Sequence, residues 1–297
     1  MKVGLYDYQG KGTGLGRLIQ QAGHQIVTDH PYDLLLVDCD YPWAGDRIAL
    51  IEQAHDFGAL VAVYPHGGEA LHFYDGICAP HPDVDAFLVT GPGHRRFQER
   101  FGHRLILETG WYWCEQKPFE PRKPERVLFA PLHPWGDGVT IAAAHRDANI
   151  QAFDAVCGLG LPVTVRYIGN PDSCGVEPRE GVTMVQVGRD LDTRMIDEHD
   201  LVVACGTYAA LALARGKQVV MFDQEIEPHD DYFTKPVSGW AAWKHETRYP
   251  LNVGDAPLYA LAARAGNRNG QTWRREFVGP QATVESVTQV MDTIADL

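Results

Sequence analysis

The residues best suited to chemistry lie in segment 200–222, which reads DLVVACGTYAALALARGKQVVMF. Its apolar run at 201–204 predicts a buried strand, and the alanine- and leucine-rich stretch after it predicts a helix. The first N–H groups of a helix have no partner inside the helix, and the helix dipole attracts anions to that end. We therefore predict a phosphate site at Gly206, Thr207 and Tyr208, where glycine lets the anion approach the backbone. An ordinary parallel βαβ unit with a tight turn is the alternative interpretation.

A second glycine-rich stretch, DYQGKGTGLG at 7–16, follows a predicted strand at 2–6 and opens a helix. Its spacing matches neither the G-x-G-x-x-G pattern of dinucleotide-binding folds nor the G-K-[ST] ending of a P-loop. We therefore expect neither NAD nor ATP there, and instead a turn whose backbone carries a substrate, with Asp7 and Lys11 at its mouth. A loop that needs glycine for positive φ angles is the alternative.

His66 follows a predicted strand at 60–64, with a proline before it and glycines after it. A histidine held in this way can exchange a proton near neutral pH or donate to a phosphate. A loop histidine that caps a helix is the alternative interpretation.

Two more loops, in the same half of the chain as Gly206, are expected to contribute to the phosphate site. The loop FAPLHPWGDG at 129–138 lies ahead of a helix, and its polar and glycine positions can line a diphosphate pocket: His133, Gly136 and Gly138. Arg189 follows a predicted strand at 182–187, where a base or ribose would lie if the diphosphate sat at Gly206.

These loops need a scaffold of strands and helices. In the first half, short apolar runs alternate with amphipathic stretches, which predicts strands at 2–6, 34–38, 60–64, 86–90 and 104–108 and helices at 15–22, 44–57 and 94–101. After a proline-rich linker at 115–125, the pattern restarts with strands at 126–130, 163–168, 182–187, 201–204 and 218–222 and helices at 140–159, 193–196 and 283–296. The chain after Phe222 reads as irregular and aromatic.

This alternation predicts an α/β chain with two Rossmann-like domains, whose parallel sheets face each other across a cleft. We place the N-terminal domain at 1–116 and the C-terminal domain at 117–280. A helix at 281–297 is expected to pack back on the N-terminal domain. Ligands of such folds bind at the carboxyl ends of the strands, where the loops above are expected to lie.

The composition of the chain excludes several classes of protein. The 297 residues carry a formal net charge of −13, which argues against a surface that binds nucleic acid throughout but allows a local basic groove of arginines at 95–104 and 264–275. No apolar run reaches the roughly 20 residues of a membrane helix, so we expect a cytoplasmic protein without membrane insertion. The six cysteines are scattered and the 13 histidines lack metal-ligand spacing, so we expect neither disulfides nor a metal site.

Three stretches carry a resemblance to a known family: RVLFAPLHPWGDG, DLVVACGTYAALALARGKQVVMF and FLVTGPGHRRFQERFGHRLILETGWYWC. Together with the order of elements, they resemble the GT-B glycosyltransferases, whose fold is shared with UDP-GlcNAc 2-epimerases and CDP-glycerol glycerophosphotransferases. Two departures stand out. The family's carboxylate within the donor helix is absent at 209–213, and Gln218 replaces the usual proline.

The resemblance implies transfer of a sugar from a nucleoside-diphosphate sugar to an acceptor hydroxyl, without a metal or a resident cofactor. It places the donor at seven residues: His133, Gly136, Gly138, Arg189, Gly206, Thr207 and Tyr208. It places the acceptor at four: Gly10, Lys11, Gly12 and Thr13. The base that deprotonates the acceptor would be Asp7 first, then His66, then Asp38 or Asp40.

Several interpretations stay open. The acceptor can be a small metabolite, a polymer or a hydroxymethylated base in DNA, and the sequence does not indicate an oligomeric state. A sugar-nucleotide epimerase or hydrolase of the same fold is an alternative, which the missing glutamates of the donor helix oppose. A non-catalytic binding module is another, and the glycine loops in both halves argue against it.

Overall fold

The computed structural model of the chain describes residues 1–6, 12–38, 45–65, 81–99, 105–132, 139–169, 171–188, 192–222, 251, 253–254 and 256–297. These residues form two compact units. Unit 1 contains the described chain up to Glu115 together with Arg275–Leu297, and unit 2 contains the described part of Gln116–Arg274. Each unit has its own parallel sheet.

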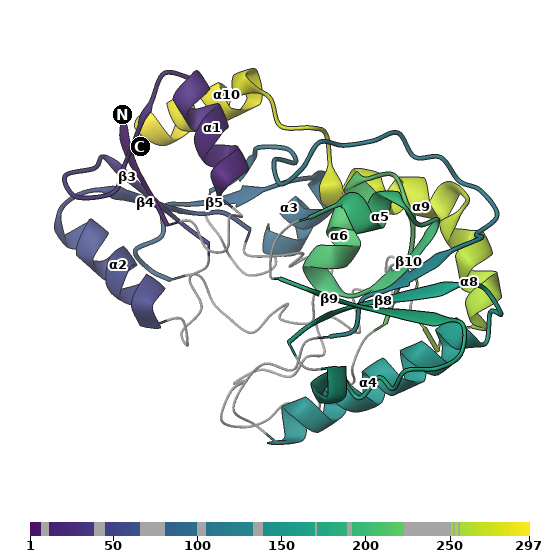
Figure 1. Cartoon of the computed structure of the whole chain (residues 1–297). Coiled ribbons are helices and arrows are strands. Elements are labelled where there is room, and N and C mark those ends of the chain that lie inside the picture. The colour runs from purple at the N-terminus through teal and green to yellow at the C-terminus, as the bar shows by residue number, and fades with distance from the viewer. Residues whose placement is uncertain are drawn as a thin grey trace. The chain divides into compact units, whose positions relative to one another are not determined.

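Unit 1 is built on a six-stranded sheet in the order β2-β1-β3-β4-β5-β6, with every neighbouring pair parallel (Figure 1). Its strands are β1 (Lys2–Leu5), β2 (Gln25–Val27), β3 (Leu34–Val37), β4 (Leu60–Val63), β5 (Ala86–Val89) and β6 (Ile106–Glu108). Its helices are α1 (Thr13–Gln21), α2 (Gly45–Asp56), α3 (Pro92–Glu99) and α10 (Val284–Ala295). Strands β3 and β5 are buried along their whole length, as expected where helices cover both faces of a parallel sheet.

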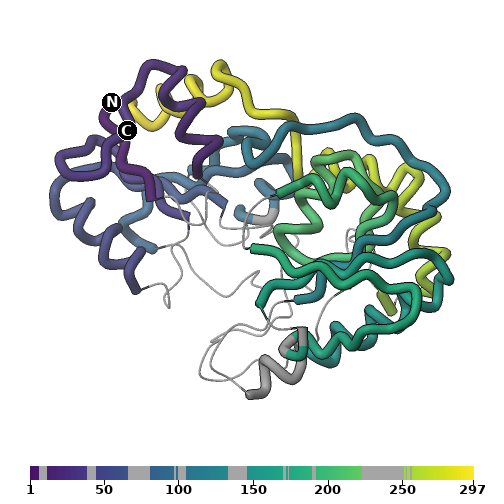
Figure 2. Tube along the Cα trace, in the orientation of Figure 1, coloured from purple at the N-terminus to yellow at the C-terminus, as the bar shows by residue number. Residues whose placement is uncertain are grey.

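The helices of unit 1 divide between the two faces of its sheet. Ile51 and Ala54 of α2 pack with Leu35, Val37 and Val61 in one hydrophobic core. On the other face α1 lies beside α10, so the two ends of the chain are neighbours (Figures 1 and 2). Helix α10 buries Val287, Val290, Met291 and Ile294, and it begins with a capping box between Thr283 and Ser286.

Unit 2 is built on a five-stranded parallel sheet in the order β11-β10-β7-β8-β9. Its strands are β7 (Val127–Phe129), β8 (Val163–Ile168), β9 (Val182–Val187), β10 (Leu201–Ala204) and β11 (Gln218–Met221). Its helices are α4 (Val139–Cys157), α5 (Arg194–Asp197), α6 (Gly206–Ala214), α8 (Leu258–Ala265) and α9 (Arg268–Trp273). A core of Phe129, Phe153, Val165 and Leu261 joins α4 and α8 to one face of this sheet.

Helix α6 packs on the opposite face of the unit 2 sheet, against β10 and β11. All of its residues except Thr207 are buried, and alanine and leucine occupy every position from 209 to 214. A helix that is apolar on all sides belongs in the interior, so this segment is fixed in place by packing. Its first turn is therefore held rigidly against the sheet.

The chain returns to unit 1 at Arg275, within a five-residue π-helix (Arg274–Val278). Thr90 donates its hydroxyl to the carbonyl of Phe277 at 2.6 Å. Gly279 has φ +71°, and a Cβ there would lie 2.0 Å from the carbonyl oxygen of Thr90. Glycine is therefore required at 279, and the returning segment is packed tightly on the end of β5.

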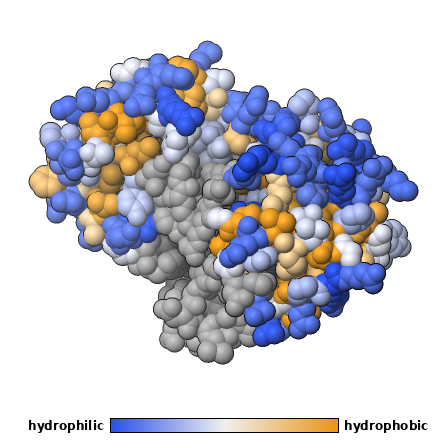
Figure 3. Space-filling model, viewed as in Figure 1, coloured by the Kyte–Doolittle hydropathy of each residue, from blue (hydrophilic) through white to orange (hydrophobic). Residues whose placement is uncertain are grey.

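The predicted α/β class with two parallel sheets is confirmed. Strand β2 and helices α8 and α9 were not predicted from the sequence. In Figure 3, hydrophilic side chains cover much of the described surface, with smaller hydrophobic areas among them. No helix in the part of the chain that the structure describes is both long and apolar enough to cross a bilayer.

Candidate functional site

In unit 2, the strand order reverses between β7 and β10, which are hydrogen-bonded neighbours. The chain winds outward from β7 through β8 to β9, then crosses to β10 and β11 on the other side. In open α/β sheets, this switch point leaves a crevice at the carboxyl ends of the two strands, and ligands bind there. The segments that follow β7 and β10 are therefore the candidate site of unit 2.

The segment after β10 has the geometry of an anion site. Cys205 is extended (φ −120°, ψ 160°), and its side chain makes no capping hydrogen bond to α6. Gly206 has φ +52°, in the left-handed region that favours glycine. The main-chain N–H groups of the first turn are thus not capped by the side chain that precedes it, and they lie at the positive end of the helix dipole.

Sequence reasoning missed Arg166, which lies beside this turn. Its guanidinium carbon is 4.4 Å from the ring centre of Tyr208, in the first turn of α6. Arg166 is only 8% exposed, and its Nη2 donates to the carbonyl of Gly188 at 3.3 Å, just beyond β9. The contact therefore links the end of β9 to the start of α6 and places a buried positive charge near the switch point.

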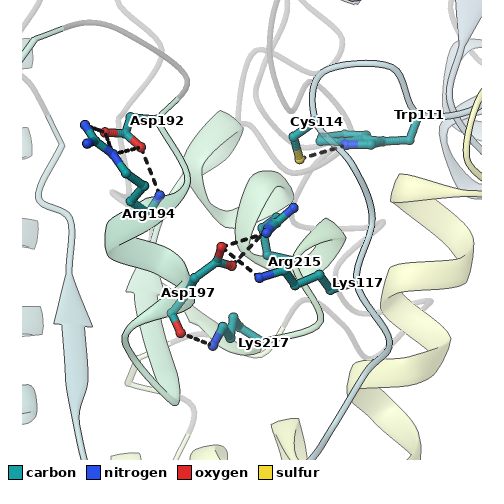
Figure 4. Close-up of polar contacts among 8 residues, drawn as sticks. All are labelled: Trp111, Cys114, Lys117, Asp192, Arg194, Asp197, Arg215 and Lys217. Atoms are coloured by element: carbon teal, nitrogen blue, oxygen red, sulfur yellow. Dashed lines mark hydrogen bonds and ion pairs between the residues drawn. The ribbon is translucent and has the colours of Figure 1, made fainter.

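The chain after Gly188 resumes in the structure at Asp192, which is bound by Arg194. Nε of Arg194 donates to Oδ1 and Oδ2 of Asp192 at 3.0 and 2.8 Å (Figure 4). Hydrogen bonds from the Arg194 side chain and main chain lower the pKa of Asp192, and the charge of Arg166 lowers it further. Asp192 is therefore an ionised partner of Arg194 and unsuited to act as a base.

Unit 1 has its own switch point, between β1 and β3. Tyr6 follows β1, Asp38 follows β3, and Asp46 and Arg47 lie in the first turn of α2. Arg47 donates to Asp38 at 3.1 Å and to Asp46 at 2.7 Å, and its guanidinium carbon is 4.8 Å from the ring centre of Tyr6. The Tyr6 hydroxyl donates to Asp46 at 2.9 Å.

The contacts of this cluster exclude one of the candidate bases, Asp38. The Asp38 side chain is fully buried and ion-paired with Arg47, so it stabilises the arginine and is poorly placed to take a proton from a substrate. The side-chain hydrogen bond from Arg47 lowers the pKa of Asp46 most; burial opposes it, and the hydrogen bond from Tyr6 lowers the pKa further. Burial and the hydrogen bond to Asp46 raise the pKa of Tyr6, so its hydroxyl stays protonated.

The glycine-rich stretch after β1 is described from Gly12 onward. Gly12 is the N-cap residue of α1 and is buried, whereas Thr13 is exposed. A Cβ on Gly14 would lie 2.0 Å from the carbonyl oxygen of Tyr112, so this glycine lets α1 pack on the segment 111–113. The glycines of this stretch therefore include one needed for packing, apart from any role in binding.

The remaining candidate residues lie outside the described part of the chain. On the acceptor side they are Asp7, Gly10, Lys11, Asp40 and His66. On the donor side they are His133, Gly136, Gly138 and Arg189. Among the residues that are described, no group of three or more His, Cys, Asp or Glu side chains is arranged to hold a metal ion.

Four of the arginines of the predicted basic groove contact other residues of the chain. Arg95 donates to Glu108 at 2.7 Å, and Glu276 pairs with both Arg96 and Arg275. Arg274 donates to the side-chain oxygen of Gln116 at 3.0 Å. Three of these contacts pair an arginine with a carboxylate, which reduces the positive charge offered to a nucleic-acid backbone.

No protein-family model matches the chain, and no curated protein matches it in sequence. Solved structures match it in fold. The structure of Staphylococcus aureus MnaA with UDP aligns over 100% of this chain and 95% of its own, with 9% identity and a TM-score of 0.54. The glycosyltransferase SnogD from Streptomyces nogalater aligns over 99% of both chains at 12% identity and a TM-score of 0.45. VinC in complex with dTDP aligns over 100% of this chain and 99% of its own at 11% identity and a TM-score of 0.46.

Of these three alignments, only that to MnaA exceeds a TM-score of 0.5, and its low identity makes it evidence of fold alone. The chain has the fold of the GT-B glycosyltransferases, with two Rossmann-like parallel sheets. This confirms the fold that the sequence resemblance implied.

Proposed function

We propose that the chain is a glycosyltransferase that moves a sugar from a nucleoside-diphosphate sugar to an acceptor hydroxyl. The observation that carries the proposal is the start of α6: a glycine at positive φ opens a buried helix at the switch point of the unit 2 sheet. Main-chain N–H groups in this position bind phosphate groups well. UDP in the MnaA structure, which shares the fold, agrees with a nucleotide ligand.

The chemistry follows from where charge develops. As the bond between sugar and diphosphate breaks, the leaving diphosphate gains negative charge. The N–H groups of Gly206 and Thr207, the dipole of α6 and the cation of Arg166 would stabilise that charge in the transition state. The donor site would be completed by five further residues: His133, Gly136, Gly138, Arg189 and Tyr208. In this proposal these groups replace a metal ion and a resident cofactor.

Unit 1 would supply the base and carry the acceptor. We propose Asp7 as the base, with His66 as the alternative, because each follows a strand of the unit 1 sheet at its carboxyl end. The backbone of Gly10, Lys11, Gly12 and Thr13 would lie against the acceptor. Asp38 is removed from the list of bases by its ion pair with Arg47.

The charge at the unit 1 switch point helps to choose between the possible classes of acceptor. Asp38 and Asp46 together outweigh Arg47, so the described part of this edge carries a net negative charge. A polyanionic acceptor such as DNA would be repelled there, whereas an uncharged hydroxyl compound would not. We therefore favour a small molecule or an uncharged polymer over a hydroxymethylated base in DNA.

Binding of a nucleotide is the first test. UDP, dTDP, GDP, CDP and ADP are added at millimolar concentration, and the unfolding midpoint is followed by calorimetry. A ligand at about 100 times its dissociation constant stabilises the folded state by roughly 2.7 kcal/mol, which gives a readily measured shift. If none of the five raises the midpoint, the proposal is wrong.

The reaction is then followed with the sugar derivative of the nucleotide that binds. Release of the nucleoside diphosphate only when an acceptor is present supports a transferase. Release without an acceptor identifies a hydrolase, and an isomeric sugar nucleotide identifies an epimerase. Binding without any turnover across a set of alcohols, glycans and hydroxymethylated DNA identifies a binding module.

A further inference from the structure

Positive side chains gather at the opposite edge of the unit 2 sheet, before β10 and β11. Lys117 and Arg122 belong to the segment that leads into unit 2, and Arg215 and Lys217 lie between α6 and β11. Asp197, at the end of α5, lies among them (Figure 4). The candidate donor site lies at the carboxyl ends of the strands, so this cluster is separate from it.

Two carboxylates contact these cations in the described part of the chain, Asp197 and Asp200. Asp197 accepts from Nε of Arg215 at 2.9 Å and from Nζ of Lys117 at 2.9 Å. Asp200 accepts from the main-chain N–H of Glu125 at 3.0 Å and is ion-paired with Arg122 at 2.6 Å. Three of the four cations are thereby matched with a carboxylate.

Lys217 is the exception. Its Nζ donates to the main-chain carbonyl of Asp197 at 2.8 Å, and no carboxylate lies within 4.0 Å of it in the described part of the chain. Its side chain is partly buried, and this burial, together with the charge of Arg122, lowers the pKa of Lys217, which the charges of Asp197 and Asp200 offset only in part. An ammonium group has three donors, and among the described residues only the carbonyl of Asp197 accepts from that of Lys217.

The cluster therefore carries more positive charges than its carboxylates neutralise. Four cations, Lys117, Arg122, Arg215 and Lys217, face two carboxylates, Asp197 and Asp200. Holding like charges together costs free energy, which a bound anion would recover. The surplus stands out in a chain whose formal net charge is −13.

We propose that Lys217, Lys117 and Arg122 form a second anion site, which binds a phosphate dianion at the amino ends of β10 and β11. Two negative charges match the surplus, and the oxygens of a phosphate accept from ammonium and guanidinium groups in charge-assisted hydrogen bonds. The ligand is inorganic phosphate or a phosphomonoester. The site does not depend on the proposed transferase activity.

A bound phosphate would also order the segment that carries two of its ligands. Residues 117–122 have no regular secondary structure, and main-chain hydrogen bonds hold both ends of this segment, from Lys117 to Ala214 and from Arg122 to the side chain of Gln218. A phosphate bound by Lys117, Arg122 and Lys217 would add hydrogen bonds at both ends of this segment. Its amide hydrogens should then exchange more slowly.

The test titrates the full chain with inorganic phosphate and, separately, with glycerol 3-phosphate, at fixed ionic strength in a calorimeter. We compare the wild type with Lys217→Met, with Lys217→Arg and with Lys123→Met, a matched control at an exposed lysine of the same segment. Gly206→Val is included because phosphate could also bind at α6. All variants are first checked for a native circular-dichroism spectrum and a cooperative unfolding transition.

We expect at least tenfold weaker binding for Lys217→Met, whereas Lys217→Arg, Lys123→Met and Gly206→Val should retain wild-type affinity. Hydrogen exchange at 117–122 should slow with phosphate in the wild type and not in Lys217→Met. Tighter binding of one of the two ligands identifies it as the natural source of the phosphate group. The proposal fails if the wild type binds neither ligand, or if Lys217→Met binds as tightly as Lys123→Met. Loss of binding in Gly206→Val alone would place the phosphate at α6 and overturn it as well.

Discussion

The guanidinium of Arg166 on β8 lies over the ring of Tyr208 in α6, with 4.4 Å between the guanidinium carbon and the ring centre. The contact joins a strand on one side of the switch point to the helix on the other side. Because Arg166 also donates to Gly188, it connects the ends of β8 and β9 with the start of α6. A single buried cation thus organises the edge of the sheet where we place the diphosphate.

Replacing Arg166 with methionine should weaken the binding of a nucleoside diphosphate about 10- to 100-fold. A hydrogen bond to a charged group contributes about 1.5–3 kcal/mol, which corresponds to this range. The loss should be smaller for the nucleoside monophosphate, which has fewer charged oxygens. Isothermal titration of both ligands measures it, with Arg268→Met as the control at an exposed arginine of the same unit. Equal losses for the two ligands would show that Arg166 does not act on the diphosphate.

Gly206→Val should abolish measurable nucleotide binding and also lower stability. Its φ of +52° costs a side chain about 1–2 kcal/mol, and the added side chain would stand in the first turn of α6, where we place the phosphate. Gly160→Val is the matched control, because Gly160 has φ +66° and a Cβ at this position would have no atom within 4 Å. Both variants should lose similar backbone stability in urea unfolding. Only the variant at 206 should lose the nucleotide, and retained binding there would exclude the α6 site.

Asp7→Asn should lower turnover by about 10²–10⁴-fold and leave donor binding unchanged. An amide has nearly the shape of the carboxylate but cannot accept the proton of the acceptor hydroxyl, and general base catalysis contributes about this factor. Turnover and the dissociation constant of the nucleoside diphosphate are measured on the same preparation. His66→Asn is made in parallel. If Asp7→Asn keeps full activity and His66→Asn loses it, histidine is the base.

Much of the fold could be predicted because apolar runs and amphipathic stretches alternate clearly along the chain. The strands β7, β10 and β11 are short apolar runs bounded by turns, and they lie where the pattern placed them. Strand β2 has three residues, none of them buried, so it lacks the apolar run that identifies a strand. Helix α8 lies in the part of the chain after Phe222 that reads as irregular, although its own sequence LYALAARA is rich in alanine.

The site was less predictable, because its polar residues belong to different elements. Gly206 could be found from a local pattern of strand, glycine and helix. Arg166 could not be connected to it, since the contact with Tyr208 exists only once β8 and α6 pack together. A signal was nevertheless present: an arginine within the apolar strand VTVRYI is unusual in a parallel sheet, where buried strands are almost continuously apolar. Arg47 could not be connected to its partner from the sequence either, because Asp38 comes from another element.

Asp197 should make stability depend on pH in acid. Burial raises the pKa of this carboxyl, but hydrogen bonds from Arg215 and Lys117 outweigh that effect, so the pKa is lower in the folded chain than in the unfolded one. The contribution of Asp197 is therefore complete above about pH 4, the ordinary range for aspartate, and is lost as the pH falls through the lower, folded pKa. Asp197→Asn should destabilise the chain by about 2 kcal/mol at pH 7, because it leaves the buried Arg215 without its charged partner.

The free energy of urea unfolding, measured between pH 7 and pH 3, tests this dependence. The difference between the wild type and Asp197→Asn should be constant down to about pH 4 and should shrink below it, since protonation then removes the same charge from the wild type. Asp147→Asn, at an exposed carboxylate on α4, should differ little from the wild type over the whole range. A difference at position 197 that stays constant down to pH 3 would mean that its charge does not hold Arg215 and Lys117 in place, and that shape alone fixes this end of α5.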